Sequence, residues 1–244
     1  METREKLIAQ VRAALGRELP VDLRHYPLTL DVGVDGVLII EGETKSVAAK
    51  KLALELAASV PGITGIVDRL RVAPARRMGD GQIRDHIRDA ILEEPVFENC
   101  ALRVRFDGNW QTVRSPNALQ RSSIDVSVAE GVVTLDGQVG SLSHKCLAGA
   151  LAWWVPGTRD VINGLEVAPP QEADDAEINE AVRLVLEKDP LINAINIRVT
   201  TKNSVVTLDG VAVNEDEKEA AEIDAWCGFG VNRVINRLEL KREF

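Results

Sequence analysis

Histidine and cysteine are the residues of this chain best suited to metal binding or catalysis. His25, His86 and His144 lie far apart, and none has a Cys or a second His at the spacing of a metal site. The sequence contains no nucleophile elbow, no Walker loop and no dinucleotide-binding fingerprint. It therefore predicts no catalytic residue, no metal ligand and no bound cofactor, and we expect the protein not to be an enzyme.

The three cysteines, Cys100, Cys146 and Cys227, are scattered and show no paired spacing. This pattern favours reduced thiols over a disulfide framework, and hence a reducing compartment. The first residues, from Met1 to Ile8, lack the apolar segment of a signal peptide, and no run of about 18 apolar residues occurs anywhere. We expect a cytoplasmic protein without a transmembrane segment.

The chain of 244 residues carries a net charge of −9. An acidic protein is repelled by the phosphates of nucleic acids and by anionic lipids. We therefore expect no nucleic acid partner. Contact with an anionic membrane would need a local basic surface.

Lysines recur at one position of a repeated pattern. Lys50, Lys145 and Lys218 each lie twelve residues before a glycine, near the expected start of a helix. Lys50, its neighbour Lys51 and Lys145 are candidate contacts for a membrane or a ligand, since basic side chains attract anionic head groups. The alternative is a solvated helix face whose aliphatic stems cover apolar neighbours.

Two tryptophans are further candidates for a membrane or ligand contact. Trp154 follows Trp153 at the end of an expected helix, and Trp110 lies in a segment without a counterpart elsewhere in the chain. Indole rings are favoured at the depth of lipid head groups, so both Trp154 and Trp110 could anchor the protein there. For Trp154 the sequence leaves a second interpretation open, namely partial burial between modules.

The elements that must position these residues form an internal repeat. Residues 34–42, 129–137 and 202–210 align without gaps, and each segment is followed twenty residues later by a glycine. Each copy predicts a β-hairpin with glycine or asparagine in its turn, a helix that ends near the later glycine, and a last strand. An amphipathic helix precedes each hairpin.

The repeat predicts an α+β fold of three tandem α-β-β-α-β modules. The strands have only one strongly apolar face, so two helices should cover one face of each small three-stranded sheet. The predicted modules span residues 1–74, 79–169 and 173–244. The second module has an insertion at about 102–121, which predicts an added hairpin or a mobile loop. A tolerated surface loop without its own function is the alternative.

The second copy resembles the BON domain, a module named for bacterial OsmY and nodulation proteins. The resemblance rests on the hairpin from Gly131 to Gly137, the helix end from Val155 to Gly157 and the strand from Val161 to Leu165. It implies the α-β-β-α-β fold and a binding module, often proposed to engage phospholipid membranes. Many members of the family are periplasmic and osmotically induced, which makes the periplasm the alternative location.

The resemblance leads us to expect a non-enzymatic binding protein. Its expected partner is a phospholipid membrane surface, or a related ligand, in envelope or osmotic stress. The alternative is a cytoplasmic module that interacts with a protein or senses a small ligand or an ion.

Overall fold

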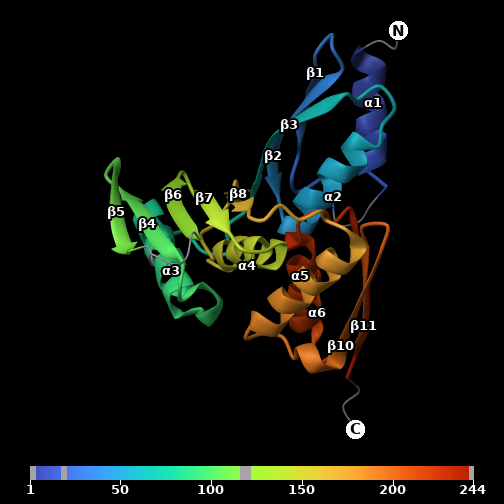
Figure 1. Cartoon of the computed structure of the whole chain (residues 1–244). Helices are drawn as coiled ribbons and strands as arrows, with labels where there is room; N and C mark the ends of the chain where they lie inside the picture. Colours follow the sequence, from blue (N-terminus) through green and yellow to red (C-terminus); the bar gives the residue numbers. More distant parts are fainter. Residues whose placement is uncertain (1–3, 18–20, 116–121, 242–244) are drawn as a thin grey trace. The chain divides into compact units, whose positions relative to one another are not determined.

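The computed structural model describes residues 4–17, 21–115 and 122–241 (Figure 1). Module 1 contains α1 (Arg4–Leu15), β1 (Thr29–Val32), β2 (Val37–Thr44), α2 (Val47–Ala58) and β3 (Gly65–Val72). Module 2 contains α3 (Asp80–Glu93), the 3-10 helix η1 (Pro95–Phe97), β4 (Ala101–Phe106), β5 (Asn109–Arg114), β6 (Ser123–Ala129), β7 (Val132–Val139), α4 (Leu142–Trp153), β8 (Asp160–Asn163) and β9 (Glu166–Val167). Module 3 contains α5 (Asp175–Lys188), the 3-10 helix η2 (Ala194–Asn196), β10 (Ile197–Lys202), β11 (Val205–Ala212), α6 (Glu215–Cys227) and β12 (Arg233–Leu240).

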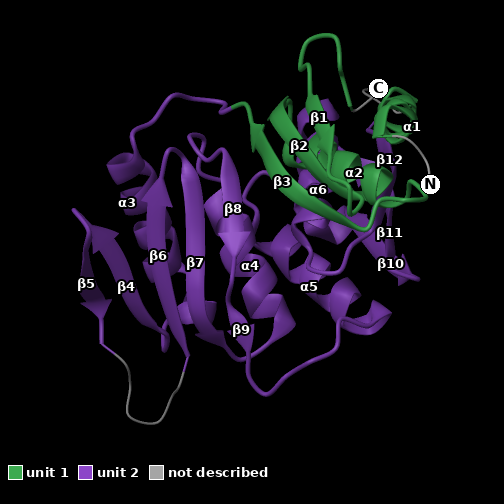
Figure 2. Cartoon of the chain, turned by 90° about the horizontal axis from the view of Figure 1, so that it is seen from above, with its two compact units in different colours: residues 1–73 green, residues 74–244 purple. Residues whose placement is uncertain are grey.

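These elements form two compact units, residues 1–73 and residues 74–244, which Figure 2 colours separately. The first unit holds one sheet and the second holds two, and each sheet combines parallel and antiparallel pairs. The α+β fold of repeated helix-and-sheet modules is thereby confirmed over the described residues. The predicted module boundaries stay a prediction.

Module 1 shows how a module is built. β1 pairs antiparallel with β2, and β2 pairs parallel with β3, so the connecting helix α2 must cross a face of the sheet. Leu7, Val11 and Leu15 lie one turn apart on α1 and are buried in the same core. Buried residues of the sheet and of α2 complete this core: Val32, Leu38, Ile40, Ala53, Ala57 and Leu70.

The hairpin turns require backbone with positive φ. Gly36 supplies it in module 1, and Gly131 supplies it in module 2 together with Glu130, whose φ is 54°. In module 3, Asn203 and Ser204 adopt it instead, with φ of 51° and 60°. The carboxylate of Asp175, at the start of α5, accepts hydrogen bonds from the N–H groups of both turn residues at 2.8 and 2.9 Å. These two bonds hold the turn in a conformation that serine rarely adopts.

A second glycine is needed where each repeated segment ends. Gly137 of β7 and Gly210 of β11 have φ of 119° and 135°. A Cβ atom at these positions would lie 2.3 Å from the carbonyl oxygen of Ser123 and 2.0 Å from that of Asn196. The glycine at the end of the repeated segment therefore permits a close approach of two backbone segments.

Module 2 differs from the expected three-stranded sheet. Its strands follow the order β5-β4-β6-β7-β8, with β9 also paired to β7. The inserted segment forms the hairpin β4–β5 over residues 101–114, so of the two forms considered the hairpin is the one observed. Residues 116–121 of the insertion lie outside the described residues. β4 joins the sheet because Leu102 and Val104 alternate with arginines and enter the apolar core.

Modules 2 and 3 pack against each other through helices α4 and α5 (Figure 1). An apolar cluster joins them, made of Leu142, Cys146 and Ala150 from α4 and Ala181 and Val185 from α5. Three of these side chains are small, which lets the two helices approach closely. The two modules therefore form one compact unit with a shared interior.

Candidate functional site

The hairpin β4–β5 carries Trp110, the most exposed of the predicted contact residues, with 43% of its surface accessible. The guanidinium carbons of Arg103 and Arg105 lie 5.4 and 6.0 Å from the centre of its ring. Arg105 is the direct register partner of Trp110 on β4. We call Arg103, Arg105, Phe106, Trp110 and Val113 the hairpin surface, and all five residues are exposed.

Arg103 is positioned by a bidentate ion pair with Asp125 of β6. Its Nε donates to Oδ1 at 2.7 Å, and its Nη2 donates to Oδ2. The hydrogen bond and the charge of Asp125 raise the pKa of the Arg103 guanidinium. Arg105 makes a long hydrogen bond from Nε to the carbonyl oxygen of Gly108, at 3.4 Å. Its remaining N–H groups can donate to a phosphate or a carboxylate.

Phe106 lies on the opposite face of the hairpin from Trp110, because it follows Arg105 in the strand. The guanidinium carbon of Arg84, on α3, lies 4.6 Å from the centre of its ring. The turn between the strands, residues 107–108, has positive φ at both positions. The end of the hairpin thus presents an aromatic ring on each face, each in contact with arginine.

Lys50 lies inside module 1. Its Nζ donates to the carbonyl oxygen of Leu70 at 2.9 Å and pairs with Oδ2 of Asp68 at 2.9 Å. The side chain is buried, so the ammonium ties the start of α2 to β3. Contact of Lys50 with a membrane or ligand stays a prediction, and it would require this pair to open. The neighbouring Lys51 is half-buried. Burial raises the pKa of the Glu55 carboxyl, and the charge of Lys51 acts against that rise.

Lys145 and Trp154, near opposite ends of α4, each contact module 3. The Nζ of Lys145 lies 4.5 Å from the centre of the Phe229 ring of module 3. Trp154, half-buried at the end of α4, donates from Nε1 to Oδ1 of Asp224 on α6 at 2.8 Å. For Trp154 this place agrees with the interpretation of burial between modules. Neither residue lies on the hairpin that carries Trp110.

Asp224 has an unusual environment, since both it and the nearby Asp189 are buried. Burial raises the pKa of Asp224 to about 8. The hydrogen bond from Trp154 acts against this shift, and the charge of Asp189 adds to it. A carboxyl with this pKa is mostly neutral at pH 7. It belongs to the interior of the compact unit, and the sequence did not mark it as special.

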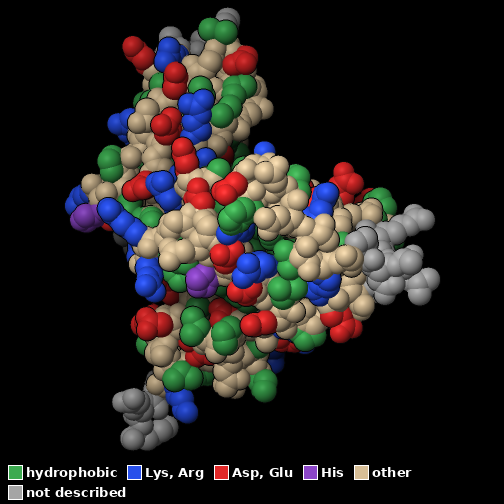
Figure 3. Space-filling model, turned by 90° about the vertical axis from the view of Figure 1, so that its left-hand side faces the viewer, with side chains coloured by type: hydrophobic (Ala, Val, Ile, Leu, Met, Phe, Trp, Pro, Cys, Tyr) green, Lys and Arg blue, Asp and Glu red, His purple; other side chains and the backbone are tan. Residues whose placement is uncertain are grey.

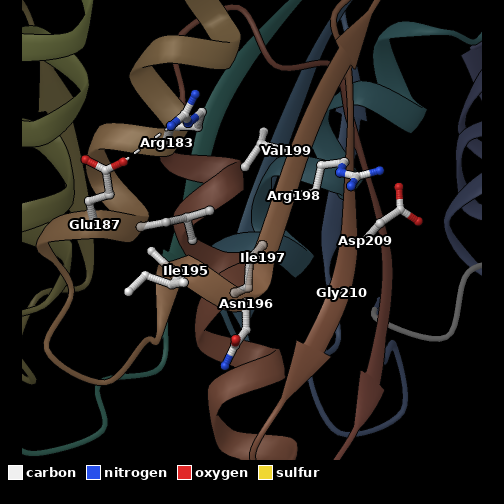
Figure 4. Close-up of a pocket in the computed structure, with 11 residues that line it drawn as sticks. Arg183, Glu187, Ile195, Asn196, Ile197, Arg198, Val199, Asp209 and Gly210 are labelled. Carbon is white, nitrogen blue, oxygen red and sulfur yellow. Dashed lines mark ion pairs between the residues drawn. The ribbon is translucent and has the colours of Figure 1, made fainter.

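A groove of about 780 Å³ lies in module 3 between α5 and the start of β10 (Figure 4). Figure 4 shows Val199 pointing toward α5 and Arg198 pointing the other way. Ile195, which lines the groove, is 95% exposed. Arg183 and Glu187 form an ion pair of 3.7 Å along the α5 wall. The groove was not predicted from the sequence, although the alternation of apolar and polar residues from Ile195 to Val199 indicates an apolar strand face there.

Other kinds of site find little support in the part of the chain that the structure describes. No group of three or more His, Cys, Asp or Glu side chains there could hold a metal ion. None of the helices described is long and apolar enough to cross a bilayer. On the face in Figure 3, basic, acidic and hydrophobic side chains are intermixed, without a broad area of one charge. On this face, attraction to an anionic surface would depend on small local groups of basic side chains.

Comparison with known proteins confirms the resemblance seen in the sequence. The family model described as the BON domain matches residues 4–74, 107–169 and 174–242. An uncharacterized protein in the gshII 5′ region of Anaplasma centrale is 30% identical over 125 residues, which cover 49% of this chain and 83% of that protein. The osmotically-inducible protein Y of Escherichia coli strain K12 is 28% identical over 129 residues, which cover 50% of this chain and 64% of that protein.

The C-terminal domain of CdsD, a structural protein of the type III secretion system of Chlamydia trachomatis, is similar at 14% identity. The match covers 99% of this chain and 100% of that domain, with a TM-score of 0.25, too low to indicate a shared arrangement. The three family matches, in contrast, follow the three sheets in order and cover most of the chain. This protein therefore belongs to the BON domain family.

Proposed function

We propose that this BON protein is a non-enzymatic binding protein whose hairpin surface contacts phospholipid head groups. The observation that carries the proposal is the exposed ring of Trp110 with the guanidinium groups of Arg103 and Arg105 within 6.0 Å of its centre. We also propose a role in osmotic or envelope stress, because a relative of this chain is named for its osmotic induction.

An indole ring beside arginines suits the membrane interface. The ring is favoured among lipid head groups, and guanidinium N–H groups bind phosphate oxygens. Each basic residue near an anionic membrane contributes about 1 kcal/mol. Because the whole chain carries a charge of −9, long-range repulsion opposes these local contacts. We therefore expect weak, reversible binding that decreases as salt screens the arginines.

Co-sedimentation of the full chain with liposomes tests the proposal. The vesicles are phosphatidylcholine alone, or phosphatidylcholine with anionic phosphatidylglycerol, each at a low and a high ionic strength. We expect binding to the anionic vesicles that is weaker at the high ionic strength. Trp110→Ala should lower the partition coefficient about tenfold, and Arg105→Gln about fivefold.

Two exposed residues of module 3 provide matched controls. Leu240→Ala removes an exposed apolar side chain, and Arg237→Gln removes an exposed arginine from the same strand. Neither change should alter the partition coefficient. No binding to either kind of vesicle would exclude the membrane function, and equal losses in the hairpin and control variants would place the contact elsewhere.

The groove of module 3 favours protein binding as a second candidate function. It exposes the apolar Ile195 next to an outer strand, which is a common place for a polypeptide to bind. The groove and the hairpin surface lie on different modules, so the two functions do not compete for the same residues.

A further inference from the structure

Module 2 shows how a polypeptide segment docks on the edge of a BON sheet. Its inserted strand β4 pairs in parallel with β6, which places Leu102 beside Ile124 and Val104 beside Val126. Both inserted side chains enter the core. With β4 in place, Ile124 and Val126 are fully buried.

β10 is the counterpart of β6 in module 3. Both strands pair antiparallel with the next strand, and both place an isoleucine, Ile124 or Ile197, opposite the glycine that ends the repeated segment. In the described sheet of module 3, β10 is one of the two outer strands, and β12 is the other. As a result, Ile197 and Val199 are only half-buried, whereas their counterparts in β6 are covered.

The groove lies where β4 would lie if module 3 had the same insertion. It runs beside the first residues of β10 and against α5 (Figure 4). Leu186, Ile197 and Val199 provide apolar lining, and Ile195 is exposed beside them. An outer strand also presents a row of backbone N–H and C=O groups that can pair with another strand.

At one corresponding position of β6 and β10, the two modules carry side chains of opposite charge. Arg103 of β4 pairs with Asp125 on the solvent face of the sheet in module 2. In module 3, Arg198 takes the place of Asp125, since it follows Ile197 as Asp125 follows Ile124. On the inner side of each strand the register partner is a carboxylate, Asp209 for Arg198 and Asp136 for Asp125. A strand added beside β10 should therefore carry an acidic residue where β4 carries arginine, which places Arg198 between two carboxylates.

We propose that this groove binds an extended segment of a partner protein, added parallel to β10, with an acidic residue between two apolar residues. The apolar side chains cover Ile197 and Val199, and the carboxylate pairs with Arg198. A second copy of this chain fits less well, because its own β10 would bring another Arg198 to the same edge. The proposal does not depend on lipid contact by the hairpin surface.

Two fluorescent peptides test the proposal against the full chain by anisotropy. One copies residues 101–106, Ala-Leu-Arg-Val-Arg-Phe, and the other carries Arg103→Glu. The glutamate peptide should bind about fivefold more tightly than the arginine peptide. In the Arg198→Asp variant of the chain this preference should reverse. Because Arg198 is exposed, we expect the variant to remain folded.

Backbone pairing and the apolar contact have their own tests. Alternate N–H groups of an added strand face its neighbour, so two glutamate peptides N-methylated at successive positions should differ, with only one losing affinity. Ile195→Ser should weaken the binding of both unmethylated peptides. Ile162→Ser, at an exposed isoleucine of module 2, is the matched control and should leave binding unchanged.

Several results would overturn the proposal. The first is that neither peptide binds at concentrations up to about 1 mM. The second is that the arginine and glutamate peptides bind with equal affinity. The third is that the two N-methylated peptides lose affinity equally. Hydrogen exchange that shows protection in β6 instead of β10 would mean that the peptide displaces β4. A dimer of the chain that Ile195→Ser abolishes would assign the groove to a second copy.

Discussion

The indole Nε1 of Trp154, at the end of α4, donates a hydrogen bond of 2.8 Å to Oδ1 of Asp224 on α6. This bond links the residue that caps the C-terminus of α4 to a buried carboxyl of the next module. Burial raises the pKa of Asp224 to about 8, while the bond from Trp154 acts in the opposite direction. Protonation of Asp224 is thus coupled to the packing of modules 2 and 3.

Asp224 should contribute to the free energy of unfolding of residues 74–244, and this contribution should decrease as the pH rises from about 4 to about 8. The pKa of Asp224 is about 8 in the folded state, above its ordinary value of 3.8. Across this window the folded state keeps a proton that the unfolded state has released. The contribution of neutral Asp224 is fully present below the ordinary pKa and is lost as the pH passes the folded value. Thermal unfolding of the full chain across this window measures it as a decrease in Tm.

Asp224→Asn should remove this part of the pH dependence. Asparagine can still accept a hydrogen bond from Trp154, and it has no proton to lose. At about pH 8 we expect the variant to gain at least about 1 kcal/mol in the free energy of unfolding, the equivalent of roughly one pKa unit. Asp216→Asn, at an exposed position of the same helix, is the control. Parallel pH profiles of wild type and Asp224→Asn would contradict the raised pKa.

Trp154→Phe should destabilise the same unit by about 1–2 kcal/mol, because the ring is kept but the N–H donor to Asp224 is lost. The loss of this donor should also raise the pKa of Asp224 further, so the pH dependence should extend to higher pH. Chemical denaturation at several pH values measures both effects. Trp110→Phe, at the exposed ring of the hairpin, should leave the free energy of unfolding nearly unchanged.

The order of helices and strands could be predicted because its signals are local. The turn residues, the glycine at the end of each repeated segment and the spacing of apolar residues all lie within one copy of the repeat. The position of β4 could not be predicted in the same way. Its neighbour in the sheet is β6, and the intervening β5 pairs on the other side of β4. Pairing between strands that are not consecutive depends on the packing of the whole module.

The lysines that recur at one position of the repeat, Lys50, Lys145 and Lys218, show why the candidate site was harder to predict than the fold. At one position of the last strand, module 1 has Asp68, whereas modules 2 and 3 have Asn163 and Asn236. Asp68 pairs with the ammonium of Lys50. Asn163 instead donates from Nδ2 to the backbone carbonyl oxygen of Lys145 at 2.8 Å. One change from carboxylate to amide thus alters the role of the lysine, and this partner lies eighteen residues away in the sequence.

Lys50→Met should destabilise module 1 by about 2 kcal/mol, because it leaves Asp68 and the carbonyl oxygen of Leu70 without the ammonium. Lys51→Met, at the half-buried neighbouring position, should change the free energy of unfolding by less than about 0.5 kcal/mol. Since residues 1–73 form their own compact unit, only the unfolding of that unit should shift. Lipid binding that is lost in Lys50→Met at unchanged stability would instead make Lys50 a contact residue.

Asp175→Asn should lower the Tm of the full chain at neutral pH. The two oxygens of Asp175 accept the N–H groups of Asn203 and Ser204, and an amide has only one oxygen to accept them. These two hydrogen bonds lower the pKa of Asp175. Its contribution is therefore present above the ordinary pKa of 3.8 and is lost as the pH falls through the lower folded value.

The difference in Tm between wild type and Asp175→Asn should accordingly shrink in acid. Asp80 bonds the N–H groups of Glu130 and Gly131 in the same way, at 2.9 and 2.8 Å, so Asp80→Asn should lower the Tm at neutral pH as well. Its effect should be comparable, because each turn holds a residue that rarely adopts positive φ, Glu130 in module 2 and Ser204 in module 3. If Asp175→Asn lowers the Tm equally at neutral and acid pH, the charged carboxylate is not what holds the turn of module 3.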